Sequence, residues 1–270
     1  MGEILFAPYF RDSVELPASL PTTLEMLASE EIIKGTEAWS VRKVVGVGEH
    51  FIAKYSPHND AIEGTNLLFL ERNNLQGFVP LLYAMWKEAD GTLFLLTLQE
   101  SGKDNILDQT RAIISQIRAI PHEDFFGAPK YPAHISGPFM TERDLLQGLV
   151  SKSRANAQDN GRHSYLADFF EAELKRVLAF DDRKPVFTHC DLQQKNILVE
   201  EVAGVSRKKE FRVSLVDWES SGWYPVYWEY FVAFISLMWE DDWCSKISGA
   251  VDTWPAEAAM MKIMHQDLWM

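Results

Sequence analysis

The pattern of apolar and polar positions divides the chain into a strand-rich first part and a helix-rich second part. Two pairs of alternating or β-branched runs flank turn signals: residues 39–45 and 50–56 around the sequence GVGE, and residues 81–100 around Asp90–Gly91. Between these pairs, helical spacing of apolar residues predicts one helix at residues 60–73. The first part of the chain is therefore expected to form a small antiparallel sheet with one helix.

Amphipathic helical patterns dominate the chain beyond residue 103. Apolar residues recur at helical spacing in four runs, namely residues 105–120, 164–180, 227–243 and 253–269. The sequence TERD, which begins at Thr141, fits a capping box and predicts a shorter helix. A linker near residue 100 would then separate an N-terminal lobe, residues 1–100, from a C-terminal lobe, residues 101–270.

Composition and charge narrow the classes of partner. With 270 residues, 47% hydrophobic and 24% charged, the chain resembles a globular protein of one large domain or two lobes. The 26 Lys and Arg residues against 39 Asp and Glu residues give a net charge of −13, which argues against a nucleic-acid or anionic-membrane partner and mildly favours a cationic one. The two cysteines, Cys190 and Cys244, lack metal-ligand spacing, and no run approaches the roughly 18 apolar residues of a spanning helix. A cytoplasmic protein is expected.

A polar island interrupts good strand material in the sequence FTHCDLQQKNILVE, residues 187–200. The apolar flanks favour strands, the polar residues favour a loop, and the run FRVSLVDWE returns as a partner strand that ends near Asp217. Asp191 and Asn196 in the loop are therefore expected to converge with Asp217. Such oxygen ligands bind Mg²⁺ in phosphoryl transfer, in which a further carboxylate orients the attacking hydroxyl.

Two motifs in this region carry a family resemblance. HCDLQQKN, which begins at His189, has the form of an HxDxxxxN catalytic loop, and VDWE, which ends at Glu219, has the form of the metal-binding aspartate motif that follows it. Together with QIRAIP and ISGPF, they resemble the aminoglycoside phosphotransferase and choline kinase family, in its fungal branch, over nearly the whole chain. The resemblance implies an α+β, protein-kinase-like fold with a small antiparallel-sheet, nucleotide-binding N-terminal lobe and a larger, mainly helical, catalytic and substrate-binding C-terminal lobe.

The resemblance also implies ATP and Mg²⁺ as cofactors and assigns roles in the catalytic loop. Asp191 would be the catalytic base, and Asn196 and Asp217 would be the magnesium ligands. His189 would be a structural member of the loop. Glu229 would anchor the loop rather than react.

In the N-terminal lobe the resemblance implies a lysine that binds phosphates and a glutamate that pairs with it. Lys54 on the second strand of the first hairpin fits the lysine, with Glu63 as its partner and Glu71 as the weaker choice because it lies two turns later. Without the distant loop, a solvent-facing strand lysine would be the ordinary interpretation of Lys54. The adenine would contact the backbone at the lobe junction, formed by Leu98, Gln99 and Glu100.

Residues for the acceptor substrate are less sharply indicated. Glu219 would tune the metal or meet a substrate cation, with a surface carboxylate as an equally weighted alternative. Trp223 fits the core first, and a cation–π contact to the substrate second. The remaining candidates, which are solvated helix positions by default, are Asp144, Glu171 and Asp241.

The predicted function is an ATP- and magnesium-dependent kinase that phosphorylates a hydroxyl of an amino alcohol, an aminoglycoside-like sugar or a secondary metabolite. Two departures favour the alternative of a pseudokinase, a non-catalytic nucleotide- or metabolite-binding module. The GVGE turn is poor in glycine for a phosphate cradle, and Cys190 stands where relatives usually carry glycine. A protein kinase is disfavoured because DWE replaces DFG and no APE segment follows.

Overall fold

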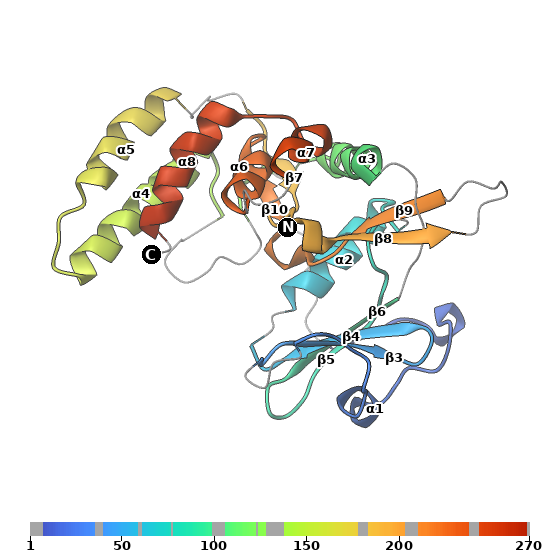
Figure 1. The fold of residues 1–270 in the computed structure, drawn as a ribbon. Coiled ribbons are helices and arrows are strands. Elements are labelled where there is room, and N and C mark those ends of the chain that lie inside the picture. Colours follow the sequence, from blue (N-terminus) through green and yellow to red (C-terminus); the bar gives the residue numbers. More distant parts are fainter. Residues whose placement is uncertain are drawn as a thin grey trace. The chain divides into compact units, whose positions relative to one another are not determined.

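The computed structural model describes residues 8–35, 40–58, 61–76, 78–98, 106–122, 124–127, 138–177, 183–202, 210–237 and 243–268 (Figure 1). The chain separates into two compact units, described here one at a time. The first comprises Met1–Ile106 and Leu198–Glu219, and the second comprises Leu107–Ile197 and Ser220–Met270. The first unit thus includes a segment from the second half of the chain, whereas the sequence pattern assigns all of residues 101–270 to one lobe.

The first unit contains a six-stranded antiparallel sheet with the order β1-β5-β6-β4-β3-β2. Its strands are β1 (Tyr9–Phe10), β2 (Ile32–Lys34), β3 (Lys43–Val47), β4 (Phe51–Ser56), β5 (Leu82–Lys87) and β6 (Leu93–Leu98). The two predicted hairpins are confirmed as β3–β4 and β5–β6, with Gly48 (φ +63°) and Gly91 (φ +91°) in left-handed turn conformations that favour glycine. In this register Lys54 of β4 lies opposite Val44 and Leu95.

The prediction of a single helix in the first hundred residues was wrong, because α1 (Thr23–Leu27) precedes α2 (Ile62–Arg72). Thr22 and Glu25 form a reciprocal capping box that begins α1. The helix has five residues and buries only Met26, so it is too short to show helical spacing. The helix predicted at residues 60–73 is confirmed as α2.

Helix α2 packs on the sheet at close range. A side chain at Gly64 would place its Cβ 2.5 Å from the sulfur of Met85 on β5, so only glycine permits this approach without movement of Met85. The first turn of α2, including Glu63, is thereby held near the sheet. Ala53 and Tyr55 flank Lys54 on β4 and point to the opposite face of the sheet, where they belong to a buried hydrophobic cluster.

The hairpin predicted after the polar island is confirmed as β8 (Ile197–Val202) and β9 (Glu210–Leu215). Leu215 is fully buried, and its backbone nitrogen donates a 3.0 Å hydrogen bond to the Phe78 carbonyl oxygen. A 3₁₀ turn at Trp218–Ser220 follows β9. Asp217 and Glu219 therefore belong to the same unit as the six-stranded sheet.

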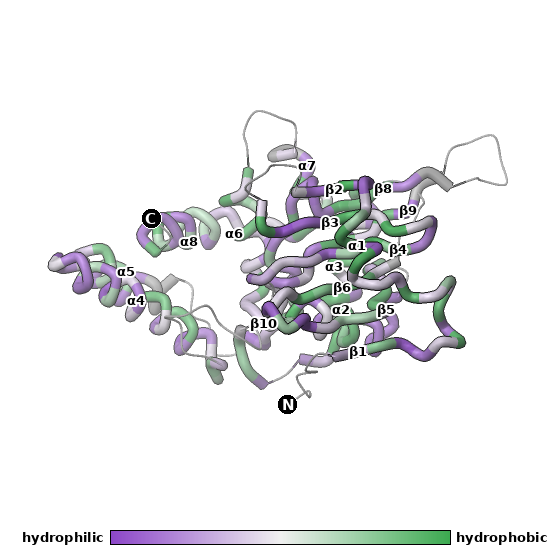
Figure 2. Tube along the Cα trace, turned by 90° about the horizontal axis from the view of Figure 1, so that it is seen from below, coloured by the Kyte–Doolittle hydropathy of each residue, from purple (hydrophilic) through white to green (hydrophobic). Residues whose placement is uncertain are grey.

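The second unit is mainly helical. Its helices are α3 (Ile106–Arg118), α4 (Glu142–Asp159), α5 (Tyr165–Val177), α6 (Trp228–Ile235), α7 (Trp243–Ala250) and α8 (Pro255–Leu268). Helix α4 packs against both α5 and α8, and α8 packs against α6 (Figure 1), around a core that includes Phe170, Tyr227 and Met264. Polar and apolar positions intermix along α4 and α5 (Figure 2), as expected for helices with one buried face.

Two helix predictions in this unit need correction. Thr141 caps α4 through a 3.1 Å hydrogen bond from the Asp144 nitrogen, but the helix is 18 residues long rather than short, because its apolar face continues through Leu149 and Val150. The run at residues 227–243, predicted as one helix, ends at Ile235. There the Ser236 hydroxyl bonds the Val232 carbonyl oxygen at 2.9 Å and offers the backbone an alternative to further helix.

A second short strand pair lies beside the catalytic loop. β7 (Val186–Thr188) pairs in antiparallel fashion with β10 (Gly222–Tyr224), a strand that the sequence pattern does not predict because it has only three residues. Among the described residues, no helix combines the length and the apolar character that crossing a bilayer requires.

Candidate active site

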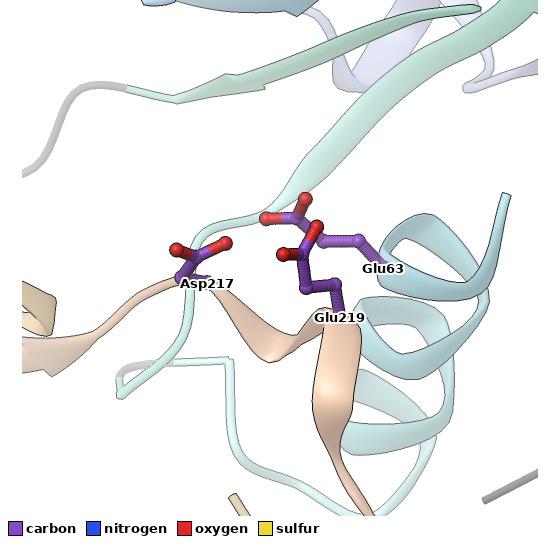
Figure 3. Close-up of side chains that lie close together, drawn as sticks. All are labelled: Glu63, Asp217 and Glu219. Carbon is purple, nitrogen blue, oxygen red and sulfur yellow. The ribbon is translucent and has the colours of Figure 1, made fainter. Parts of the chain in front are cut away.

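A buried ion-pair cluster in the first unit surrounds the ammonium of Lys54. Its Nζ atom lies 2.6 Å from Glu63 Oε2 and 2.6 Å from Asp217 Oδ1. All three side chains are nearly buried, with 11–12% exposure. Figure 3 shows Glu63 projecting from α2 toward Asp217 and Glu219, which come from the segment after β9. The pairing of Lys54 with Glu63 agrees with the sequence-based expectation, whereas Glu71 pairs with Arg11 instead.

Local backbone structure positions the two acidic residues of the DWE motif. Asp217 has φ +69°, a left-handed conformation that is uncommon for a non-glycine residue. The Trp218 indole nitrogen donates to the Leu215 carbonyl oxygen at 2.6 Å, and Asn66 of α2 donates to the Trp218 carbonyl oxygen at 2.8 Å. These contacts fix the turn that presents Asp217.

Burial and ion pairing have opposite effects on the charges of this cluster. Burial disfavours the charged form of Lys54, but attraction to Glu63 and Asp217 outweighs it, so the pKa of Lys54 is raised. Burial likewise opposes ionisation of Asp217, but the adjacent ammonium outweighs it, so the pKa of Asp217 is lowered. For Glu63 burial prevails, and its pKa is raised. Lys54 is therefore a fixed cation, as phosphate binding requires.

An outer layer of charges surrounds this cluster. Arg42 Nη1 lies 2.9 Å from Glu219 Oε1, and Lys34 Nζ lies 4.0 Å from Asp217 Oδ2. Glu219 Oε2 is also 4.0 Å from Lys54 Nζ. Sequence patterns did not identify Arg42 or Lys34, since neither belongs to a motif.

The acidic residues of the cluster fit a divalent cation. Glu63, Asp217 and Glu219 each offer a carboxylate oxygen, and these oxygens lie within 4.8 Å of one another. An all-oxygen set of this kind suits a hard ion such as Mg²⁺. Each of these carboxylates has an oxygen within 4.0 Å of Lys54 Nζ.

The second unit carries the predicted catalytic loop, which Glu229 of α6 contacts. Glu229 is 1% exposed, and its Oε2 accepts a 2.7 Å hydrogen bond from the His189 backbone nitrogen. Burial raises the pKa of Glu229 to about 7, although hydrogen bonds from the backbone of His189 and Cys190 favour the charged form. His189 is fully buried, and its Nδ1 accepts a 3.2 Å hydrogen bond from the Asp191 nitrogen. These contacts correspond to the predicted anchoring of the loop.

Asp191 is held by its own loop. Asn196 Nδ2 donates to Asp191 Oδ2 and to the Asp191 carbonyl oxygen, each at 2.8 Å. The Gln193 amide donates to Asp191 Oδ1, and the Lys195 ammonium lies 3.5 Å from Asp191 Oδ2. Because the amide nitrogen of Asn196 is occupied by Asp191, its amide oxygen is the atom that could bind a metal.

Cys190 takes the backbone conformation that explains the usual glycine at this position. Its φ is +66°, in the left-handed region that disfavours side chains. The thiol is packed against the core of the second unit. Burial raises the pKa of the thiol well above its ordinary value, so it is not a nucleophile at neutral pH. The side chain is accommodated without loss of the hydrogen bonds around Asp191.

Some of the other residues predicted for the site lie outside the part of the chain that the structure describes. Trp223 is 4% exposed, with its ring 5.3 Å from that of Phe187, which supports a core role. Asp144 is exposed, and Glu171 pairs with Arg154. The side chain of Leu98, together with Gln99, Glu100 and Asp241, lies outside the described part of the chain.

The GVGE segment, which is poor in glycine for a phosphate cradle, forms the predicted turn that joins β3 to β4 beside Phe51. The unpredicted strand β2 pairs with β3 and aligns Lys34 with Val44, which is itself opposite Lys54. Arg42, which ends the β2–β3 connection, therefore adjoins the Lys54 cluster through Glu219.

The comparisons with known proteins agree with this architecture. The model of the phosphotransferase enzyme family matches residues 67–260. No curated protein sequence matches the chain. Two similar solved structures are ternary complexes of thermostable mutants of aminoglycoside phosphotransferase APH(4)-Ia with AMP-PNP and hygromycin B. One has 14% identity and a TM-score of 0.55, covering 88% of this chain and 83% of that one. The other has 15% identity and a TM-score of 0.53, covering 91% and 90%.

A third similar structure is a proposed fructosamine-3-kinase from Haemophilus somnus 129PT, with 14% identity and a TM-score of 0.53 over 83% of this chain and 77% of that one. At these identities the likeness concerns the fold, and it confirms the predicted kinase-like α+β architecture. The family match covers well over half of the chain. The chain belongs to the phosphotransferase enzyme family.

Proposed function

We propose that the chain is an ATP- and magnesium-dependent kinase that transfers the γ-phosphoryl group to a hydroxyl of a small molecule. The observation that carries the proposal is the buried ammonium of Lys54 between Glu63 and Asp217, in a chain of the phosphotransferase enzyme family. A fixed, partly enclosed cation is the feature that recognition of nucleotide phosphates requires. The AMP-PNP complexes of the similar aminoglycoside phosphotransferase support nucleotide binding.

Lys54 would bind the α- and β-phosphates, with Glu63 holding its ammonium in place. Because Glu63 is buried and its Oε2 lies 2.6 Å from the Lys54 ammonium, it restricts that ammonium to one position, without competition from solvent water. This prearrangement reduces the reorganisation needed when nucleotide binds. The adenine contact at Leu98, Gln99 and Glu100 remains part of the proposal.

Magnesium would be held by Asp217 and by the amide oxygen of Asn196, with Glu219 as a neighbouring carboxylate. When bound, the ion would neutralise charge on the phosphates and hold them in line for transfer. The residues present supply carboxylate and amide oxygens, which are the ligands that Mg²⁺ prefers.

Asp191 would orient the acceptor hydroxyl. In the reaction, a bond forms between the hydroxyl oxygen and the γ-phosphorus while the bond from the γ-phosphorus to the β–γ bridging oxygen breaks, and the hydroxyl proton passes to Asp191. Asn196, Gln193 and Lys195 contact the Asp191 carboxylate, so they fix its direction. Positioning of this kind would supply much of the rate, since phosphoryl transfer needs little covalent work from the protein.

The proposed acceptor is a hydroxyl-bearing amine, such as an amino alcohol, an aminoglycoside-like sugar or a secondary metabolite. The net charge of −13 supports a cationic substrate. The hygromycin B complexes of the similar aminoglycoside phosphotransferase support an acceptor of this size and chemistry. The free cysteine Cys190 fits a reducing compartment, and we place the activity in the cytoplasm.

The test combines binding and turnover. Calorimetric titration with ATP and MgCl₂ should give saturable binding, and ADP release should rise with at least one member of a panel of hydroxyl-bearing amines. Asp191→Asn should retain nucleotide binding and lose turnover. Binding without turnover over the whole panel would support the pseudokinase instead, and lack of binding would reject both.

A further inference from the structure

The charges around Lys54 form a closed set in which each of the cations already has an acidic partner. Lys54 is paired with Glu63 and Asp217, and Arg42 with Glu219, while Lys34 approaches Asp217. The three cations and three carboxylates of this set balance. A polyphosphate that entered the site would therefore find no cation without a carboxylate beside it, and some pairs must open to bind it.

The pairs differ in how readily they can open. Lys54 and its partners are nearly buried, with 11–12% side-chain exposure, whereas Arg42 and Glu219 are 38% and 36% exposed. An ion pair exposed to this extent is held much less strongly than a buried pair, whose charges are costly to separate. Lys34, which is 57% exposed and 4.0 Å from Asp217, is too far for a hydrogen bond. Among the hydrogen-bonded pairs of the set, Arg42–Glu219 is thus the one that separates most readily, and Glu219 is also one of the three carboxylates that could bind a divalent cation.

The position of Arg42 suits contact with phosphates. It ends the β2–β3 connection, whose base is tight: a Cβ at Gly35, which has φ +88°, would lie 2.3 Å from the Arg42 carbonyl oxygen. The backbone of Arg42 is further held by the Ser40 hydroxyl at 2.8 Å. Its guanidinium is therefore delivered from a fixed base to the side of the Lys54 cluster, and guanidinium groups bind phosphates in bidentate fashion.

We infer that Arg42 is a second phosphate-binding residue, held by Glu219 until nucleotide and divalent cation bind. The inference rests on the proposed function and adds to it a residue outside the family motifs. Glu219 would turn to the divalent cation as Arg42 turns to the phosphates, so the two ligands would favour each other's binding. A second phosphate-binding cation would compensate for the scarcity of glycine in the GVGE turn between β3 and β4.

The test is a double-mutant cycle on the binding of AMP-PNP, measured by calorimetry with and without MgCl₂. Arg42→Ala should weaken binding with MgCl₂ by about tenfold or more, and Arg42→Lys should recover part of the loss. Without MgCl₂, Glu219→Gln should tighten binding because it releases Arg42. The same substitution in the Arg42→Ala background should give no gain.

Lys43→Ala is the matched control. Lys43 is adjacent to Arg42, and its replacement by alanine removes the same charge. Its side chain, however, alternates to the other face of the sheet, where it lines a groove with Tyr55 and Phe94. It should bind AMP-PNP like the wild type. Thermal midpoints within a few degrees of the wild type would show that the variants are folded.

The outcomes separate this inference from the proposed function. If the wild type binds AMP-PNP and Arg42→Ala binds within twofold of it, the inference is overturned and the proposed function stands. A gain from Glu219→Gln that persists without the arginine also overturns the inference. If neither the wild type nor Lys43→Ala binds AMP-PNP, the proposed function itself is rejected, and the inference with it.

Discussion

Replacement of Glu229 by glutamine should alter how stability depends on pH. Glu229 is 1% exposed, and burial raises its pKa from an ordinary 4.5 to about 7. A carboxyl whose pKa is raised on folding stabilises the folded state below the unfolded pKa, and this contribution is lost as pH rises through the folded value. The wild type should therefore lose stability between pH 4.5 and about 7.

The magnitude follows from the two pKa values. The difference between 4.5 and about 7, at about 1.4 kcal/mol for each pH unit, gives about 3 kcal/mol. Glutamine has nearly the same shape as the protonated carboxyl and does not titrate. The stability of Glu229→Gln relative to the wild type should consequently rise by about 3 kcal/mol from about pH 4.5 to about pH 8.

The assay is urea unfolding of both proteins over this pH range, with the difference in unfolding free energy as the measured quantity. Other titrating groups act in both proteins, so they cancel in the difference. Glu49→Gln, in the exposed β3–β4 turn, is the matched control and should give a constant difference. A difference for Glu229→Gln that stays constant within about 1 kcal/mol would refute the reasoning.

Three other substitutions test the interiors of the two units by urea unfolding. Lys54→Met should destabilise the chain by about 3–5 kcal/mol because it leaves buried carboxylates uncompensated, and adding Glu63→Gln should restore part of the loss; an unchanged midpoint would contradict the ion-pair cluster. Asn66→Ala should cost about 1–3 kcal/mol through loss of its buried bond to the Trp218 carbonyl oxygen, and a neutral effect would show that this bond does not hold the turn. Burial raises the pKa of Glu142 to about 7, so Glu142→Gln should also reduce the fall in unfolding free energy as pH rises toward neutral. A pH profile equal to that of the wild type would contradict the raised pKa of Glu142.

The sequence predicts those elements whose apolar pattern is long. The hairpins β3–β4, β5–β6 and β8–β9 and the helix α2 follow from alternation, turn residues and helical spacing. The strands β2 and β10 have three residues each, so they carry no measurable period, and β10 in addition depends on a partner distant in sequence, β7.

The residues of the candidate site also differ in whether a sequence pattern identifies them. Motifs identify Asp191, Asn196 and Asp217, and the family resemblance that these motifs carry points to Lys54 and Glu63. Their roles in the reaction stay predictions.

Arg42 has no such signal. Its partner Glu219 is 177 residues away, and a basic residue at a strand end ordinarily faces solvent. Contacts of this kind arise from the tertiary fold and require coordinates.

Transfer of label from γ-labelled ATP to a hydroxyl-bearing amine tests the central claim most directly. With the wild type and MgCl₂, the label should appear as a phosphate ester on the hydroxyl of at least one acceptor, and Asp191→Asn should reduce this transfer by about a hundredfold to ten-thousandfold. Retention of all label in ATP or free phosphate with every acceptor, or equal transfer by Asp191→Asn, would contradict the account.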